Sequence, residues 1–254
     1  MIALVSDLHS NLEALEAVLK DLAPRNAARV YCLGDVVGYG PNPNEVIDHA
    51  RKFDLTILGN HDEAVTGMPL GFNPLAKEVI EWTREELRPT LLSARVKKDR
   101  WNFLERLPTT HRENDILYVH GSPRQPTTEY ILKTDVQSLL GEVPPKIRDI
   151  FERFPWVCIV GHTHEPGVIT QDGRFLTPED LGYEYHFERN RKYIVNPGSV
   201  GQPRDGDVRS SYATLDGDVI RWHRVNYDID AVVSRIKAHA RIDDRLGDRL
   251  TRGR

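Results

Sequence analysis

Five short apolar segments of this chain each run directly into an aspartate, an asparagine or a histidine. In the clearest case, Val30 to Leu33 form an apolar run typical of a buried strand, and Gly34 and Asp35 follow at once. An aspartate is a poor strand residue and is costly to bury without a partner. The five segments end in Asp7-Leu8-His9, Asp35, Asn60-His61-Asp62, His120 and His162-Thr163-His164. Their repetition predicts a metal site at the carboxyl edge of a sheet.

The mixture of carboxylates and imidazoles limits which metals suit this site. Asp7 and His9 are two residues apart, and in an extended segment such residues point to the same side. Carboxylate oxygen together with imidazole nitrogen favours Mn, Fe, Zn or Ni over Ca or Mg. A pair of ions lowers the pKa of bound water and clamps phosphoryl oxygens. The candidate ligands are too many for one catalytic ion, so we expect two divalent transition-metal ions, held by Asp7, His9, Asp35, Asn60, His120, His162 and His164.

The first part of the chain must bring three of these segments side by side. Ser10-Asn-Leu-Glu13 has the pattern of a capping box, and a helix with leucines at helical spacing follows it. Asn42 and Pro43 predict the start of a second helix, with Asn42 as its N-cap. A third strand is expected at Leu55–Leu58. Taken alone, this β-α-β-α-β order predicts a doubly wound sheet with parallel strands.

The rest of the chain predicts a helical insertion and then many short strands. Residues 73–107 have a charged, helical pattern. Strands are expected at Ile116–Val119 and Val157–Val160, with one or two helices within Thr134–Arg153. Asp216-Gly217 is a hairpin signal. A helix is expected near Asp228–Ala240. Short strands are expected at Val168–Thr170, Arg174–Leu176, Tyr193–Val195, Ser211–Leu215 and Val219–Val225.

Composition excludes several classes of protein. The chain has 254 residues, a hydrophobic fraction of 39% and a net charge of −4, which argues against disorder, a membrane span and a general nucleic-acid surface. No signal peptide or transmembrane segment is recognisable, so we expect a cytoplasmic protein without a membrane partner. Cys32 and Cys158 lie inside apolar runs and predict buried thiols rather than a disulfide. We expect one domain over residues 1–240, including the insertion at 73–107, and a charged tail over 241–254 that frays.

The five polar blocks resemble those of the calcineurin-like metallophosphoesterases, from Ile2 to about Arg204. The blocks are Asp7-Leu-His9, Gly34-Asp35-Val-Val-Gly38, Gly59-Asn60-His61-Asp62, His120-Gly121 and Gly161-His162-Thr-His164. The resemblance implies an α/β (α+β) fold with a two-sheet β-sandwich flanked by helices, in place of the doubly wound sheet. It also implies hydrolysis of small-molecule phosphate esters by water that two metal ions activate, with Mn as the expected metal and Fe, Zn or Ni as alternatives.

The resemblance also implies a role for each site residue. Asp7, His9 and His164 would hold one ion, and Asn60, His120 and His162 the other. Asp35 would bridge both ions, and His61 would protonate the leaving oxygen or stabilise its charge. Within the family, the stretches His120–Arg124 and Asn196–Arg204 look like those of small bacterial and archaeal phosphodiesterases.

The second block departs from one branch of that family. Protein phosphatases and symmetrical dinucleoside tetraphosphatases carry Gly-Asp-x-x-Asp-Arg-Gly, whereas Gly38 and Tyr39 replace the second Asp and the Arg here. This weakens the interpretation as a protein phosphatase and leaves the partner that orients His61 open. Arg124 and Arg204 are candidates for binding phosphate, because guanidinium forks match phosphate oxygens.

Other functions remain open at this point. The chain could be a phosphomonoesterase, a nucleotide or dinucleoside polyphosphate hydrolase, or a non-catalytic binding scaffold of the same fold. Individual polar residues could instead be helix caps or satisfied core groups, and Asp62 is more typical of an N-cap or an acceptor than of a catalytic group. The physiological substrate and the oligomeric state do not follow from these residues.

Overall fold

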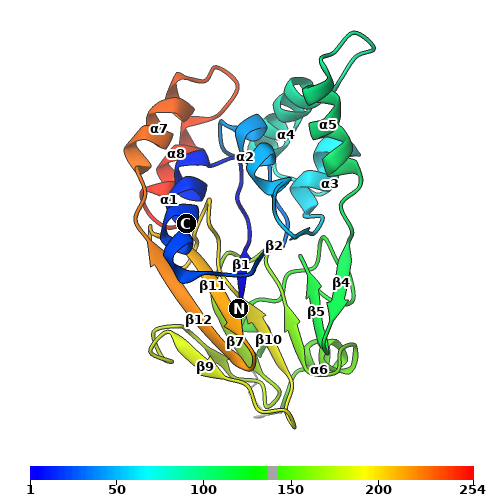
Figure 1. Ribbon diagram of the computed structural model, residues 1–254, viewed down its shortest axis with the longest axis vertical. Helices are drawn as coiled ribbons and strands as arrows, with labels where there is room; N and C mark the ends of the chain where they lie inside the picture. Colours follow the sequence, from blue (N-terminus) through cyan, green and yellow to red (C-terminus); the bar gives the residue numbers. More distant parts are fainter. Residues whose placement is uncertain (137–141) are drawn as a thin grey trace.

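Two mixed, six-stranded sheets form the framework of the protein and occupy the lower half of the view in Figure 1. The computed structural model describes residues 1–136 and 142–254. The first sheet has the order β3-β2-β1-β11-β12-β9, with β1 (Ile2–Val5), β2 (Arg29–Cys32), β3 (Leu55–Thr56), β9 (Glu184–His186), β11 (Ser210–Asp216) and β12 (Val219–Val225). The second has the order β4-β5-β6-β10-β7-β8, with β4 (Thr110–Glu113), β5 (Ile116–Val119), β6 (Val157–Ile159), β7 (Gly167–Thr170), β8 (Phe175–Leu176) and β10 (Tyr193–Asn196).

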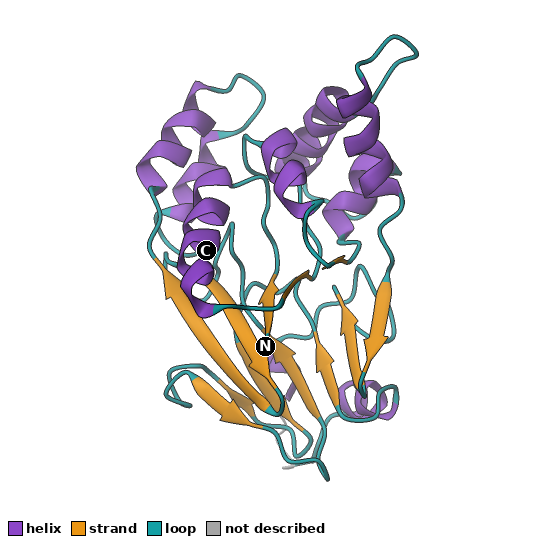
Figure 2. Cartoon of the chain, in the orientation of Figure 1, coloured by secondary structure: helices purple, strands orange, loops and turns teal. Residues whose placement is uncertain are grey.

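The helices gather mainly at one end of the molecule, beyond the strand ends (Figure 2). They are α1 (Leu12–Leu22), α2 (Pro43–Ala50), α3 (Asn60–Thr66), α4 (Pro74–Leu87), α5 (Arg95–Glu105), α6 (Pro145–Glu152), α7 (Ile229–Ala238) and α8 (Asp244–Leu250), with 3-10 turns at Ala23–Arg25 and Lys133–Val136. The part of Thr134–Arg153 at residues 137–141 lies outside the described residues. None of the described helices combines the length and apolar character that a membrane span requires.

The expected α/β fold with two packed sheets is confirmed. Strands β1, β2 and β3 pair in parallel, as the β-α-β-α-β order predicts. However, β5 and β6, which lead to His120 and His162, belong to the second sheet. The doubly wound sheet that the first half of the chain alone suggests is therefore not formed, and the two-sheet fold that the resemblance implies is. The polar strand ends converge from both sheets.

Alternation of side chains along the strands builds three apolar layers. Between the sheets, Leu4 and Tyr31 of the first pack with Tyr118 and Ile159 of the second. The outer face of the first sheet packs against α1 and α2, and that of the second sheet packs against α6. Cys32 and Cys158 face these outer layers as buried free thiols, as expected. Strands buried on both faces in this way hold their carboxyl-terminal turns rigidly.

The start of α1 differs from the predicted capping box. The N-cap is Asn11, whose Oδ1 accepts the backbone N–H of Ala14 at 3.1 Å. Ser10 has φ +54° and donates its own backbone N–H to the carbonyl of Val36. Because the chain is still in the turn that carries His9, the helix begins one residue later than the sequence pattern indicates. Asn42 does precede α2, but its side chain makes no capping hydrogen bond.

Two edge strands and the end of the chain were not anticipated. The strands β4 and β9 are polar and partly exposed, so they lack the apolar alternation on which the prediction relied. The segment 241–254 was expected to fray, but it contains α8. Leu246 and Leu250, spaced by one helical turn, are buried in a cluster with Val232 and Ile236 of α7. The expected helix near Asp228–Ala240 is confirmed as α7, with Asp228 as its N-cap.

Candidate metal centre

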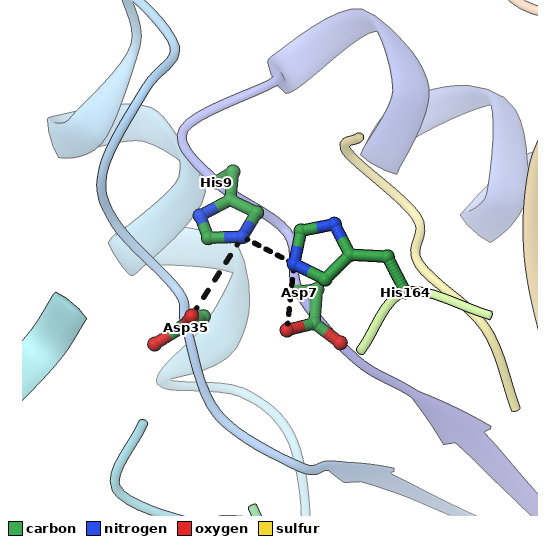
Figure 3. Close-up of side chains that lie close together, drawn as sticks. All are labelled: Asp7, His9, Asp35 and His164. Carbon is green, nitrogen blue, oxygen red and sulfur yellow. Dashed lines mark hydrogen bonds and ion pairs between the residues drawn. The ribbon is translucent and has the colours of Figure 1, made fainter. Parts of the chain in front are cut away.

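The seven predicted ligands lie together where the two sheets' polar ends meet, and they form two groups. Asp7, His9, Asp35 and His164 make the first cluster (Figure 3), in which one ligand atom of each residue lies within 4.8 Å of the others. Asp35, His120 and His162 meet the same criterion, and Asn60 Oδ1 lies 3.0 Å from His120 Nε2. We call these four residues the second cluster. Asp35 belongs to both clusters.

The carboxylate of Asp35 lies between the two clusters. Its Oδ2 is 3.7 Å from His9 Nε2 and 3.4 Å from His120 Nε2. Its Oδ1 accepts the backbone N–H of His61 at 2.8 Å, at the start of α3. Gly59 makes this approach possible, since a Cβ there would lie 2.2 Å from Asp35 Oδ1. One oxygen of Asp35, Oδ1, therefore does cap the start of α3, while the other, Oδ2, faces both clusters.

Each of the four clustered imidazoles is anchored by a backbone carbonyl. Three of them donate through Nδ1: His9 to the carbonyl of Val37 at 3.3 Å, His120 to that of Leu33 at 2.7 Å, and His164 to that of Gln202 at 2.5 Å. The fourth, His162, donates through Nε2 to the carbonyl of Thr128 at 3.3 Å. A carbonyl oxygen only accepts, so the hydrogen of each neutral ring lies on the anchored nitrogen. The other nitrogen then presents its lone pair to the cluster, which is the usual arrangement for histidines that bind metal.

These lone pairs face one another at short distance. His9 Nε2 is 3.1 Å from His164 Nε2, and His120 Nε2 is 3.1 Å from His162 Nδ1. Two neutral lone pairs repel unless a proton or a metal cation lies between or beside them. The donors therefore fit a bound cation in each cluster: two imidazoles and two carboxylates in the first, and two imidazoles, one carboxylate and one amide oxygen in the second.

The turns that carry these ligands are left-handed rather than extended. Asp7, His9, Asp35, His162 and His164 have φ between +47° and +66°. Such values are uncommon outside glycine and concentrate where function requires them. The two-residue spacing of Asp7 and His9 does bring both side chains into one cluster, but the expected reason, alternation along an extended strand, was wrong. Strands β1 and β6 end before the ligands, at Val5 and Ile159.

Burial and mutual charge shift the pKa values of the clusters. Burial alone would raise the pKa of Asp35, but His120 and His61 outweigh it and hold that pKa well below its ordinary value. Burial would lower the pKa of His120, but Asp35 and Asp7 raise it to about 9. For His162, burial and His120 lower the pKa to about 3. Without metal, the Asp35–His120 pair thus carries one buried proton that a cation must displace.

His61 and Asp62 lie at the start of α3, beside the first cluster. The His61 ring is 4.9 Å from the His9 ring, and burial lowers its pKa to about 4. Asp62 accepts the backbone N–H groups of Val36, Val37 and Gly59, which joins the turn after β2 to α3. Burial and Asp35 raise the pKa of Asp62 to about 7. Asp62 is therefore the acceptor that the sequence indicates.

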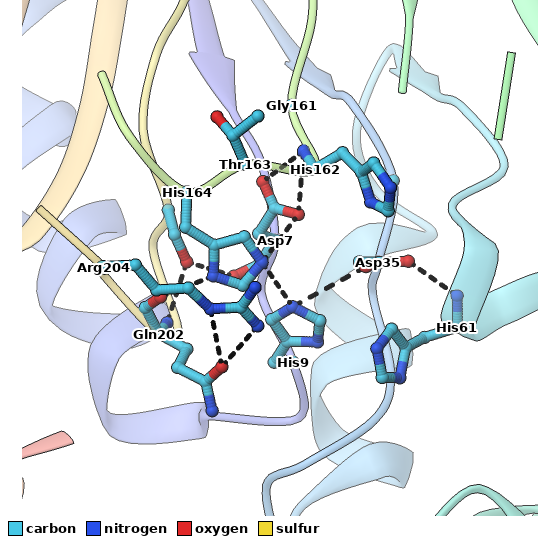
Figure 4. Close-up of polar contacts among 12 residues, drawn as sticks. Asp7, His9, Asp35, His61, Gly161, His162, Thr163, His164, Gln202 and Arg204 are labelled. Carbon is cyan, nitrogen blue, oxygen red and sulfur yellow. Dashed lines mark hydrogen bonds and ion pairs between the residues drawn. The ribbon is translucent and has the colours of Figure 1, made fainter. Parts of the chain in front are cut away.

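The two candidate arginines have different surroundings. Arg204 lies against the first cluster (Figure 4): its guanidinium donates to Gln202 Oε1 at 2.7 Å, and its charge lowers the pKa values of His61 and His164. Arg124 instead forms ion pairs with Glu129 at 3.1 Å and with Asp149 at 3.3 Å. The structure brings Arg204 together with the predicted ligands, while the guanidinium of Arg124 is neutralised by two carboxylates.

Three aromatic residues near the clusters were not predicted as part of the site. Tyr39 and Phe72 pack around His61, with ring centroids 4.4 Å and 4.9 Å from it. Tyr130 stacks on His162 at 3.7 Å. The replacement of the family's Asp-Arg pair by Gly38-Tyr39 was a usable signal for Tyr39. Phe72 and Tyr130 lie in segments without a motif, so only the folded chain identifies them.

Comparisons with known proteins identify a matching family model and a curated relative. Residues 1–218 match the model of the "Calcineurin-like phosphoesterase superfamily domain". The uncharacterized protein MJ0912 of Methanocaldococcus jannaschii is 36% identical over 264 residues, covering 100% of this chain and 98% of that protein.

Two solved structures match over the full chain. A metallophosphoesterase from Sphaerobacter thermophilus has a TM-score of 0.80 at 35% identity, covering 100% of this chain and 99% of that one. The hypothetical protein PH1004 from Pyrococcus horikoshii OT3 has a TM-score of 0.75 at 22% identity, with the same coverage, and shows the shared fold.

Proposed function

Because the chain belongs to the calcineurin-like phosphoesterase superfamily and is therefore a metal-dependent phosphoesterase, we propose that it holds two divalent transition-metal ions and hydrolyses phosphodiesters. Asp7, His9 and His164 hold the first ion, and Asn60, His120 and His162 hold the second. Asp35 bridges the two. Mn²⁺ is the proposed metal, since carboxylate, amide and imidazole donors suit it.

One observation carries the proposal of two ions rather than one. Asp35 Oδ2 lies 3.7 Å from His9 Nε2 and 3.4 Å from His120 Nε2, so a single oxygen faces the lone pairs of both clusters. When bound at these residues, two such ions would lower the pKa of water and stabilise charge on phosphoryl oxygens. The anchored imidazoles and the rigid turns hold the ligands in place before an ion arrives.

Two side chains outside the ligand set act on the substrate. His61, buried beside the first cluster, stabilises the charge of the leaving oxygen through a ring N–H, or donates a proton to it once the negative charge of bound substrate has raised the low pKa of the ring; such a role typically contributes about 10²–10⁴-fold. Arg204 binds a phosphoryl oxygen, because its guanidinium lies against the first cluster (Figure 4) and is held there by the neutral amide oxygen of Gln202 rather than by a carboxylate. Arg124 remains a weaker candidate, since its guanidinium must first leave Glu129 and Asp149.

The proposal of a diester substrate rests on the resemblance of the stretches His120–Arg124 and Asn196–Arg204 to those of small bacterial and archaeal phosphodiesterases. Of the two candidate arginines, Arg204 lies against the first cluster (Figure 4), while Arg124 is paired with Glu129 and Asp149.

A metal-and-substrate panel tests the proposal. The purified chain is stripped with a chelator, reloaded separately with Mn²⁺, Fe²⁺, Zn²⁺ or Ni²⁺, and assayed on bis-p-nitrophenyl phosphate, p-nitrophenyl phosphate and a dinucleoside polyphosphate. We expect no turnover by the stripped chain, recovery with Mn²⁺, and a higher kcat/KM for the diester. Full activity of the stripped chain contradicts the metal mechanism. A preference for the monoester or for the polyphosphate contradicts the diester specificity, and metal binding without any turnover indicates a scaffold.

A further inference from the structure

The imidazole of His61 is held without a hydrogen bond among the described residues. Its Nδ1 is buried and has no hydrogen-bond partner there, and the ring belongs to a residue only 3% exposed. The backbone N–H of His61 is fixed by Asp35 Oδ1, but that bond does not set the rotation of the ring. Asp62, the adjacent carboxylate, is occupied by backbone N–H groups of the turn after β2 and of Gly59. Something other than a hydrogen bond must fix this ring.

Aromatic packing surrounds the ring instead. The Tyr39 ring lies 4.4 Å from the His61 ring at 56°, and the Phe72 ring lies 4.9 Å away at 74°. Tyr39 is 9% exposed and also contacts the His9 ring at 4.7 Å. On the same tyrosine, the Cζ atom of Arg204 lies 5.7 Å from the ring centroid, within cation–π range. One ring therefore touches a proposed ligand, the proposed acid and the proposed phosphate-binding arginine.

The backbone at Gly38 and Tyr39 leaves just enough room for the His61 ring. A Cβ on Gly38 would lie 2.4 Å from His61 Nδ1, and Gly38 has φ +102°, so no other residue fits there without displacing the ring. Tyr39 itself has φ +58°, an uncommon conformation for a bulky residue. Backbone strain of this kind persists where the surrounding structure demands it. Here it turns the tyrosine ring onto His61.

We propose that Tyr39 is the positioning residue of His61: its ring, by packing, holds the imidazole beside the first cluster. This inference rests on the proposed role of His61 in the hydrolysis. A ring contact fixes the direction of the imidazole without adding a negative charge next to the phosphoryl group. The phenolic oxygen is not needed for this task, so Phe should replace Tyr39 and an aliphatic residue should not.

Nuclear magnetic resonance on the Zn²⁺-loaded or metal-free chain tests the packing independently of turnover. The His61 ring signals are assigned by their absence in His61→Ala, and their nuclear Overhauser effects to the Phe72 ring are measured. We expect these effects to persist in Tyr39→Phe and to be lost or strongly weakened in Tyr39→Leu. Tyr130→Leu, which removes a ring from His162 instead, is the matched control and should leave them intact. Undiminished effects in Tyr39→Leu would overturn the inference even if the chain proved inactive.

Kinetics on the Mn²⁺-loaded chain test the consequence. Misplacing a catalytic group can cost about 10²-fold in rate, so Tyr39→Leu should lower kcat by roughly tenfold to a hundredfold. The metal content should not change. The loss should be larger for a substrate with a poor leaving group than for one that releases p-nitrophenol. Tyr39→Phe should stay within about twofold of wild type, by the same argument. In the His61→Ala background, Tyr39→Leu should cause no further loss. An additive loss, or loss of an ion, would overturn the inference. If Tyr39→Leu does not fold, Tyr39→Met carries the same expectations.

Discussion

The two clusters that share Asp35 differ in charge and in enclosure. The first contains a second carboxylate, Asp7, which is fully buried, whereas the second adds the neutral amide of Asn60, which is only partly buried. The first is also covered by Gln202 and Arg204 (Figure 4). In the second, His162 is backed by Tyr130, which is 42% exposed. Ligand charge and rigidity set metal affinity, so the first cluster should hold its ion more tightly than the second.

The largest expected effect comes from removing the charge that both clusters share. Asp35→Asn keeps an oxygen that can accept the N–H of His61, so α3 keeps its start and the chain should stay folded by circular dichroism. An amide bridges two cations poorly, so activity should fall to background, and elemental analysis should find at most one ion per chain.

Asp7→Asn is the comparison for that variant. It changes the first cluster alone, so it should weaken mainly the first ion and leave the second cluster's ligands intact. If Asp35→Asn kept two tight ions and most of its activity, Asp35 would be only the cap of α3. The proposed two-metal centre would then lose its bridge.

The next effect separates chemistry from metal binding. His61→Ala leaves every proposed ligand in both clusters in place, so metal content should stay near two ions per chain. The kcat should fall by about 10²–10⁴-fold, and less for p-nitrophenol, whose oxygen needs little protonation. His186→Ala, on the exposed edge strand β9, is the matched control and should leave kcat unchanged. Equal losses across leaving groups of different pKa would contradict the acid role.

The pH dependence should distinguish the clusters. In the metal-free chain, Asp35 raises the pKa of His120 from 6.5 to about 9, so an ion entering the second cluster must displace that proton. Its apparent affinity should rise by about tenfold per pH unit below pH 9 and level off above it. Calorimetric titrations at several pH values in buffers of different ionisation enthalpy would detect the released proton.

The stability of the metal-free chain should show the opposite trend. A group whose pKa is raised on folding stabilises the protein fully below its unfolded pKa, here about 6.5, and loses that contribution as pH rises through about 9. Metal affinity and metal-free stability should therefore move in opposite directions over this window. A second cluster whose affinity did not change with pH would contradict the shared proton.

The smallest expected effect compares the two arginines. Arg204→Ala should raise KM by roughly tenfold to a hundredfold, since a hydrogen bond to a charged group is worth about 1.5–3 kcal/mol. Arg124→Ala should change KM by less than about threefold, because its guanidinium is engaged by Glu129 and Asp149. Steady-state kinetics on one diester, with both variants side by side, would measure the difference. A larger loss for Arg124→Ala than for Arg204→Ala would contradict the assignment of Arg204 as the phosphate-binding arginine.

The sequence indicates much of this site because its ligands follow strands. Asp35 and His120 each follow an apolar run, and that arrangement is visible without a structure. The helix α7 and the buried thiols were also predictable, since they depend on local pattern. The distribution of the ligand-bearing strands between two sheets was not predictable from local pattern, because an apolar run does not indicate which other strand it pairs with. It followed only from the family resemblance.

What the sequence missed depends on contacts between distant segments. The carbonyls of Val37 and Gln202 that anchor His9 and His164 carry no side-chain signal at all. The left-handed turns at Asp7 and His162 are imposed by the packed ends of the sheets rather than by local propensity. In α8, charged neighbours obscure Leu246 and Leu250, so its burial against α7 depends on tertiary packing. Such features require the folded chain.

Electron paramagnetic resonance of the chain titrated with Mn²⁺ tests the central claim most directly. We predict that the first equivalent enters the first cluster and gives the six-line signal of an isolated Mn²⁺ ion. The second equivalent should replace that signal with the spectrum of an exchange-coupled pair, because Asp35 bridges both ions. Two equivalents that bind tightly and give twice the isolated signal would contradict a bridged pair, and so would binding that stops at one ion per chain.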